Sequence, residues 1–185
     1  TYEVRPGEVL AIVGESGSGK TQSSMALIGL LPPNGRASGS AKLAGKELIG
    51  LSHSQLRHVR GNEVAVIFQE PMTALNPVLT IGYQLMEPLQ VHRNMSKEEA
   101  HKEALHLLER VGIPEAPQRM NEFPHQFSGG RRQRVMVARA LLLNPKLIVA
   151  DEPVSMIDAS LRATVLTALR TLRDEFGISL IYITH

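Results

Sequence analysis

Residues 14–21 read GESGSGKT, and their types and spacing are those of a loop that binds a chain of phosphates. Backbone N–H groups can surround a polyphosphate only where no side chain keeps it at a distance, and glycines at positions 14, 17 and 19 allow that approach. The sequence therefore predicts a phosphate-binding loop. Its eight residues are Gly14, Glu15, Ser16, Gly17, Ser18, Gly19, Lys20 and Thr21.

The residues on either side of this loop predict a strand before it and a helix after it. The apolar run Val9–Val13 has the composition of a buried strand, and the helix is expected to open near Gly19. A helix N-terminus offers unpaired amide donors and a partial positive charge of about half a unit. Lys20 would reach the β- and γ-phosphates, and the Thr21 hydroxyl would bind Mg²⁺. The alternative is an ordinary glycine-rich turn, and the flanking elements favour the phosphate loop.

A second cluster of residues suited to chemistry follows the aliphatic run 147–150, which leads into Asp151 and Glu152. In open α/β sheets the ligand crevice lies at the carboxyl ends of the strands, so both acids are expected beside the phosphate loop. Asp151 would hold Mg²⁺, directly or through water, and Glu152 would polarise a water molecule that attacks the γ-phosphate. The alternative is that the two acids only cap the turn before Pro153.

The segment 127–133, FSGGRRQ, predicts another exposed helix N-terminus. Ser128 is placed to cap this helix, and with Gly129 and Gly130 it forms a second site suited to an anion. Taken alone, a simple capped helix is the better interpretation. One nucleotide has no obvious need for two such sites, so the segment requires a further explanation.

The composition is that of a globular domain and gives no support to nucleic-acid binding. The 185 residues are 43% hydrophobic and 21% charged, and the net charge is +2. This small excess, without a basic stripe, lacks the electrostatic footprint of a DNA-binding surface. The chain has no cysteine, which excludes disulfides and thiolate metal sites within it. Because it begins with Thr1 and ends directly after a predicted strand, we expect a fragment of a longer protein.

The hydrophobic pattern predicts an α/β fold with a helical insertion. Strands and helices alternate at the two ends of the chain, whereas residues 78–143 are almost entirely helical. We predict a discontinuous α/β core over residues 1–77 and 144–185, with a mostly parallel sheet. A helical subdomain carrying the FSGGRRQ segment is predicted over residues 78–143.

Short buried strands are predicted at residues 8–13, 63–68, 147–150 and 179–184. Helices are predicted at residues 20–30, 81–92, 97–111, 129–143 and 160–175. Ser96 followed by Glu99 predicts a capping box at the start of the third helix, and Gly177 predicts a stop after the fifth.

In this order, the segments resemble the nucleotide-binding domain of ATP-binding-cassette (ABC) transporters over essentially the whole chain. GESGSGKT is similar to the Walker A motif, LIVADE to Walker B and FSGGR to the LSGGQ signature. Gln69 is similar to the Q-loop glutamine, Asp158 to the D-loop aspartate and His185 to the switch histidine. The resemblance implies a P-loop NTPase (RecA-like) fold that uses ATP and Mg²⁺.

The resemblance also implies a role for the second anion site. In this family two domains pack head to tail, and the signature of one closes over the ATP held by the other, so residues 128–130 would bind the γ-phosphate of the partner's ATP. Asp158 would lie across this dimer interface. The implied catalytic residues are Glu152, His185, Gln69 and Lys20. The implied Mg²⁺ ligands are Thr21, Gln69 and Asp151.

A narrower resemblance comes from residues 69–77, QEPMTALNP, together with residues 123–128, FPHQFS. Both are similar to segments of the oligopeptide and dipeptide importer ATPases of bacteria and archaea, to which nickel importers are close relatives. The implied protein is a peripheral ATPase at the cytoplasmic face of the cell membrane. Its partners would be a second nucleotide-binding domain, transmembrane permease subunits and, indirectly, an extracellular substrate-binding protein. The cargo contacts other subunits, so no residue here identifies it.

Some residues depart from the family pattern. Arg131 replaces the usual final glutamine of the signature, and residues 154–158, VSMID, differ from the commoner D-loop sequence. Tyr2 is a weak candidate for the aromatic residue that stacks on adenine. These departures leave the phosphate loop as the most secure part of the resemblance.

Two other functions compete with the importer. A soluble ABC-type ATPase of DNA repair or translation should carry a long coiled-coil insertion or tandem cassettes, and this chain has neither. A small-molecule kinase with a phosphate loop would need an acceptor site and would not explain Gln69 or residues 128–130. Free phosphate as the product, without a phosphorylated acceptor, would favour the transporter.

Overall fold

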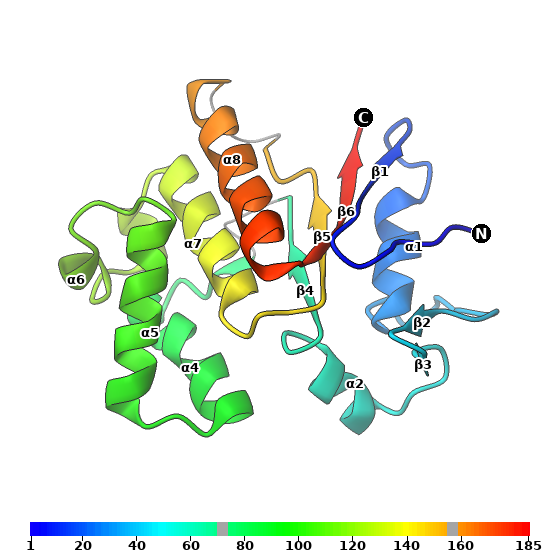
Figure 1. Ribbon diagram of the computed structural model, residues 1–185, viewed down its shortest axis with the longest axis horizontal. Helices are drawn as coiled ribbons and strands as arrows, with labels where there is room; N and C mark the ends of the chain where they lie inside the picture. The colour runs from blue at the N-terminus through cyan, green and yellow to red at the C-terminus, as the bar shows by residue number, and fades with distance from the viewer. Residues whose placement is uncertain (70–73, 155–158) are drawn as a thin grey trace.

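The computed structural model describes residues 1–69, 74–154 and 159–185, and it shows a parallel sheet with helices on both faces (Figure 1). The sheet has the strand order β1-β6-β5-β4. Its strands are β1 (Val9–Val13), β4 (Val64–Ile67), β5 (Leu147–Asp151) and β6 (Ser179–Thr184). All three pairings in this sheet are parallel, as the aliphatic composition of the runs predicted.

Alternation along the strands divides the core into two parts. On β5, Leu147 and Val149 belong to one hydrophobic cluster, while Ile148 and Ala150 belong to the other. Successive strand residues point to opposite faces, so each face of β5 is buried under a different layer. The predicted α/β fold with a parallel sheet is confirmed.

Helix α1 (Lys20–Leu27) and the helical group α4 to α7 lie on opposite sides of the sheet (Figure 1). The helix after the phosphate loop was predicted to reach residue 30, but it ends at Leu27. Gly29 takes a left-handed φ of +65°, and the Leu30 N–H donates back to the Met25 carbonyl over 3.0 Å. This turn closes the helix early because glycine adopts that backbone conformation without strain.

The predicted helical insertion contains several helices that share the larger core cluster with α8 (Ala159–Phe176). Ser96 and Glu99 form the predicted capping box at the start of α5, and Gly177 follows α8 at φ +65°. The domain boundaries at residues 77 and 144 stay a prediction. The elements of this region are α4 (Ile81–Arg93), α5 (Lys97–Arg110), α6 (Ala116–Arg119), the 3-10 turn η1 (Pro124–Gln126) and α7 (Gly129–Leu141).

Three elements between α1 and β4 were not predicted. They are the strands β2 (Lys42–Leu43) and β3 (Lys46–Glu47), which pair antiparallel, and helix α2 (His53–Val59). The Glu47 carboxylate accepts hydrogen bonds from the backbone N–H groups of Ala41 and Ile49. Hydrogen bonds from the Ser40 hydroxyl and from these amides lower the pKa of Glu47 to about 2. A side chain therefore organises a ribbon whose strands are too short to show a sequence pattern.

Parallel pairing brings the carboxyl ends of the strands to one edge of the sheet. Val13 is paired with Thr184, Asp151 with Ile183, and Ile67 with Ala150. The segments that follow these strands therefore begin side by side. None of the helices in the described ranges combines the length and the apolar character that a membrane-spanning helix requires.

Candidate functional site

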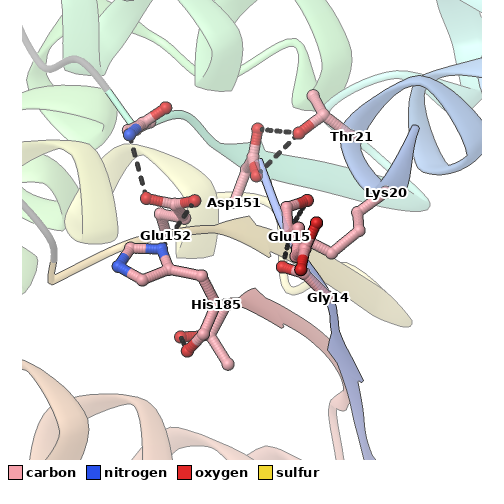
Figure 2. Close-up of polar contacts among 9 residues, drawn as sticks. Gly14, Glu15, Lys20, Thr21, Asp151, Glu152 and His185 are labelled. Carbon is pink, nitrogen blue, oxygen red and sulfur yellow. Dashed lines mark hydrogen bonds and ion pairs between the residues drawn. The ribbon is translucent and has the colours of Figure 1, made fainter. Parts of the chain in front are cut away.

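The phosphate loop projects from the end of β1 and is closed by the side chain of Lys20. The Lys20 ammonium group donates hydrogen bonds to the carbonyls of Gly14, over 2.6 Å, and Glu15, over 2.8 Å (Figure 2). Gly17 and Gly19 have φ of +79° and +87°, a region that residues with side chains rarely adopt. The glycines thus permit the backbone conformation of the loop, and the ammonium group of Lys20 lies against the loop carbonyls.

Thr21, at the start of α1, contacts the acid at the end of β5. Its hydroxyl lies 3.0 Å from Oδ1 and 2.9 Å from Oδ2 of Asp151, which is only 6% exposed. Burial raises the pKa of Asp151, the hydrogen bond from Thr21 opposes that rise, and the negative charge of Glu152 adds to it. A buried carboxylate beside a hydroxyl is a pair of oxygen ligands whose charge a cation would stabilise.

We expect Asp151→Asn to raise the thermal stability of the nucleotide-free protein at pH 7 by a few degrees. A carboxyl whose folded-state pKa is raised contributes most to stability when it is protonated, and this contribution is lost as the pH rises through that pKa. Asparagine removes the buried charge and still offers an oxygen to Thr21. Thermal unfolding from pH 7 downward should show the difference between variant and wild type shrinking. Asp174→Asn, on an exposed side chain, is the control and should give no rise.

The second acid, Glu152, is held between two polar side chains from neighbouring strand ends. The Gln69 amide, after β4, donates to its Oε2 over 2.9 Å. Nδ1 of His185, after β6, lies 3.1 Å from its Oε1 (Figure 2). The Glu152 side chain is 15% exposed, while that of His185 is 65% exposed. The carboxylate therefore has a defined orientation and is close to solvent, as a group that positions a water molecule needs to be.

The backbone of Glu152 is also unusual. Its φ of +44° lies in the left-handed region, which costs energy for a residue with a side chain. The Glu152 N–H donates to the Ile183 carbonyl over 3.0 Å, which extends the pairing of β5 with β6 by one residue. Strain of this kind is common at functional sites.

The structure joins the sequence-predicted residues into three groups: Lys20 with Gly14 and Glu15, Thr21 with Asp151, and Glu152 with Gln69 and His185. Residues 128–130 belong to none of these groups. Ser128 and Gly129 are exposed, and a Cβ built on Gly129 would meet nothing within 4 Å. Ser128 occupies the N-cap position, but its side chain makes no capping hydrogen bond, so that prediction was wrong. The Asp158 prediction lies outside the described residues.

Sequence reasoning gave no role to Gln133, which the structure places in contact with Pro153, the residue after Glu152. It is 1% exposed, and its amide donates to the Pro153 carbonyl over 2.6 Å. The signal available in the sequence was its helical spacing from Met136 and Val137, which put a glutamine on the apolar face of α7.

A family model described as ABC transporter matches residues 1–155. The chain belongs to the ABC transporter family. The resemblance to this family is therefore confirmed. We refer to the phosphate loop (residues 14–21), the LIVADE strand (residues 147–152) and residues 128–130 as the Walker A, Walker B and signature segments, after the motifs that they resemble.

Two curated relatives of this ABC family member are named as oligopeptide transport proteins. It is 50% identical over 184 residues to the oligopeptide transport ATP-binding protein OppD of Escherichia coli, covering 100% of this chain and 55% of the relative. It is 48% identical over 186 residues to the oligopeptide transport ATP-binding protein AppD of Bacillus subtilis, covering 100% of this chain and 57% of the relative. The chain thus spans about half the length of these relatives.

Solved structures agree with the fold. One is the ATP-binding cassette MJ0796, described as a dimeric post-hydrolysis state bound to ADP and Pi, with a TM-score of 0.87 and 31% identity. A second dimeric structure of that cassette has a TM-score of 0.86 and 31% identity. Each comparison covers 100% of this chain and 77% of the other. These matches confirm the predicted P-loop NTPase fold.

Proposed function

We propose that this protein is the ATP-binding and ATP-hydrolysing subunit of an ABC importer that takes up oligopeptides or dipeptides. The observation that carries the proposal is the position of Glu152, held by Gln69 and His185 beside the Thr21–Asp151 contact. The family membership supports ATP as the substrate. The names of the curated relatives support peptides as the cargo.

The residues at the start of α1 and at the end of β5 fit a magnesium nucleotide. The Thr21 hydroxyl and the Asp151 carboxylate meet within 3.0 Å, and Mg²⁺ prefers oxygen ligands of this kind. When bound, Mg²⁺ would neutralise charge on the phosphate oxygens. The Lys20 ammonium lies at the loop, where phosphate oxygens would replace the carbonyls of Gly14 and Glu15 as its acceptors.

Glu152 would orient the water molecule that attacks the γ-phosphate. One carboxylate oxygen contacts Gln69 and the other contacts His185. A water molecule that enters the site would take the place of one of these two side chains as a hydrogen-bond partner of Glu152. Gln69 would then face the water and the cation, and His185 the γ-phosphate. Hydrolysis by this arrangement depends on positioning and electrostatics, as in other phosphoryl transfers.

The signature segment is proposed to act on a partner's nucleotide. The N-terminus of α7 is exposed, and its first backbone N–H groups have no acceptors within the helix. It is therefore suited to bind an anion other than the nucleotide held by the Walker A segment of the same chain. The solved relatives are dimeric by their descriptions. We infer that two such domains pair head to tail over two ATP molecules, with Asp158 at the interface.

A cavity whose wall includes Phe68, the residue before Gln69, is the proposed docking site for a permease. It has a volume of about 350 Å³ and lies between the end of α1, strand β4 and helices α4 and α7. Its wall includes Leu30 and Phe68, which are 41% and 38% exposed. Phe68 directly precedes Gln69, so a permease segment in this cavity would be coupled to the site. The assembly would lie at the cytoplasmic face of the membrane and receive cargo from an external binding protein.

Ser128→Arg is the test of the proposed pairing. The variant should bind ATP with unchanged affinity, because Lys20 and Thr21 of the Walker A segment bond to Gly14, Glu15 and Asp151 and Ser128 is exposed at the start of α7. Its ATP-dependent dimer should be lost, and hydrolysis should fall at least about tenfold. Equilibrium titration, light scattering and phosphate release measure these three properties. His101→Arg, on the exposed surface of α5, is the matched control. A full-length Ser128→Arg protein that still dimerises with ATP would contradict the pairing.

A further inference from the structure

Gln133 connects the signature helix to the turn that carries Glu152. It lies on α7 one helical turn beyond Gly129, and it is 1% exposed. Its Nε2 donates a 2.6 Å hydrogen bond to the carbonyl of Pro153, the residue directly after Glu152. A buried side chain of the helix that begins with the signature segment therefore holds the backbone of the Walker B turn.

This contact supports a strained backbone. Glu152 has a φ of +44°, and such a conformation persists only where the surrounding structure holds it. One support is the hydrogen bond from the Glu152 N–H to Ile183 on β6. The bond from Gln133 to Pro153 is the support on the other side of the same residue. The direction of the Glu152 side chain follows from this backbone, so both supports help to set it.

The carbonyl oxygen of the Gln133 side chain indicates that a contribution to stability alone does not account for a glutamine at this position. Its Oε1 is buried and has no hydrogen-bond partner within the described part of the chain. A buried acceptor without a partner is unfavourable, and methionine would fill a similar volume without one. The useful part of the side chain is therefore its donor, which faces Pro153.

We propose that Gln133 is a positioning residue that couples the signature segment, residues 128–130, to the orientation of Glu152. The inference rests on the proposed function, in which the signature segment contacts the ATP of a partner. A shift of α7 on that contact would pass through the Gln133–Pro153 hydrogen bond to the catalytic carboxylate of the same subunit. Each nucleotide would in this way influence hydrolysis of the other.

The test is Gln133→Met in the full-length protein. Methionine removes the donor and keeps the length of the side chain, so kcat should fall about tenfold while KM and ATP affinity stay within about twofold. Gln84→Met is the matched control, because Gln84 is a 3% exposed amide on α4 that donates to the carbonyls of Asn76 and Leu79. It should lower the melting temperature without lowering kcat. An unchanged kcat in Gln133→Met, or an equal fall in both variants, would overturn the proposal.

A double-mutant cycle identifies the residue through which Gln133 acts. In a Glu152→Gln background, Gln133→Met should cause no further loss of the residual activity, and a full additional loss would overturn the coupling to Glu152. Light scattering of Glu152→Gln with ATP tests the pairing separately. If no dimer forms but Gln133→Met still lowers kcat, the proposed pairing fails and the hold of Gln133 on Glu152 stands. If the dimer forms and kcat is unchanged, the present inference fails.

Discussion

Glu152→Gln should reduce ATP hydrolysis by about 10²- to 10⁴-fold, the range expected for loss of a general base. Glutamine keeps the length of the side chain and can still hydrogen bond with Gln69 and His185, which contact the carboxylate at 2.9 and 3.1 Å. The site should therefore keep its shape and lose only the ability to polarise water. Phosphate release under saturating Mg²⁺-ATP measures the effect.

The same variant should keep its affinity for ATP. In the Walker A segment, Lys20 bonds to Gly14 and Glu15 and Thr21 bonds to Asp151, so an equilibrium titration should match the wild type. Because the nucleotide is no longer consumed, the proposed dimer should accumulate and become detectable by light scattering. A stable dimer with ATP and none with ADP is the expected pattern.

Glu63→Gln is the matched control for this prediction. Glu63 precedes β4 at the opposite edge of the sheet, where its carboxylate pairs with Lys46 and Lys146. Glu63→Gln makes the same chemical change as Glu152→Gln. It should change the thermal stability while leaving kcat near the wild-type value. Turnover by Glu152→Gln at the wild-type rate would remove Glu152 from the proposed mechanism.

Lys20→Ala should weaken ATP binding roughly 100-fold. Lys20 is placed to transfer its two hydrogen bonds from loop carbonyls to phosphate oxygens, and each charge-assisted bond contributes about 1.5 kcal/mol or more. Losing two of them corresponds to about 3 kcal/mol, or two factors of ten in the dissociation constant. Titration of the full-length protein with a fluorescent ATP analogue and Mg²⁺ measures the change.

The loop itself should survive this substitution. Gly14 and Glu15 are not buried, so water can satisfy the carbonyls that Lys20 releases, and the melting temperature should change little. Lys146→Ala is the control, since this exposed lysine pairs with Glu63 away from the loop. Wild-type affinity in Lys20→Ala would contradict the assignment of the loop as the phosphate site.

Much of the fold was predictable because its signals are local. The aliphatic run at residues 147–150 predicted a buried strand, and β5 is buried along its whole length. Gly177 predicted the end of α8 because a left-handed residue stops a helix, and its φ is +65°. The short strands β2 and β3 gave no such signal. They depend on Glu47, whose hydrogen bonds to Ala41 and Ile49 have no repeating sequence pattern.

The sequence by itself determined which residues are suited to phosphate chemistry. A loop that must expose its amides requires glycine at particular positions, and a strand that ends in acids must place them at its carboxyl end, so Gly17, Gly19 and Glu152 could be identified from their neighbours alone. These requirements involve only a few adjacent residues. They can therefore be read along the chain.

Only the tertiary structure decided how these residues meet. Gln69 lies 83 positions before Glu152 and His185 lies 33 positions after it, and their contacts depend on the parallel register of β4, β5 and β6. The burial of Gln133 and its bond to Pro153 depend on how α7 packs behind that sheet. Packing between distant segments is the combined result of many weak contacts across the core, and for that reason no short stretch of sequence encodes it.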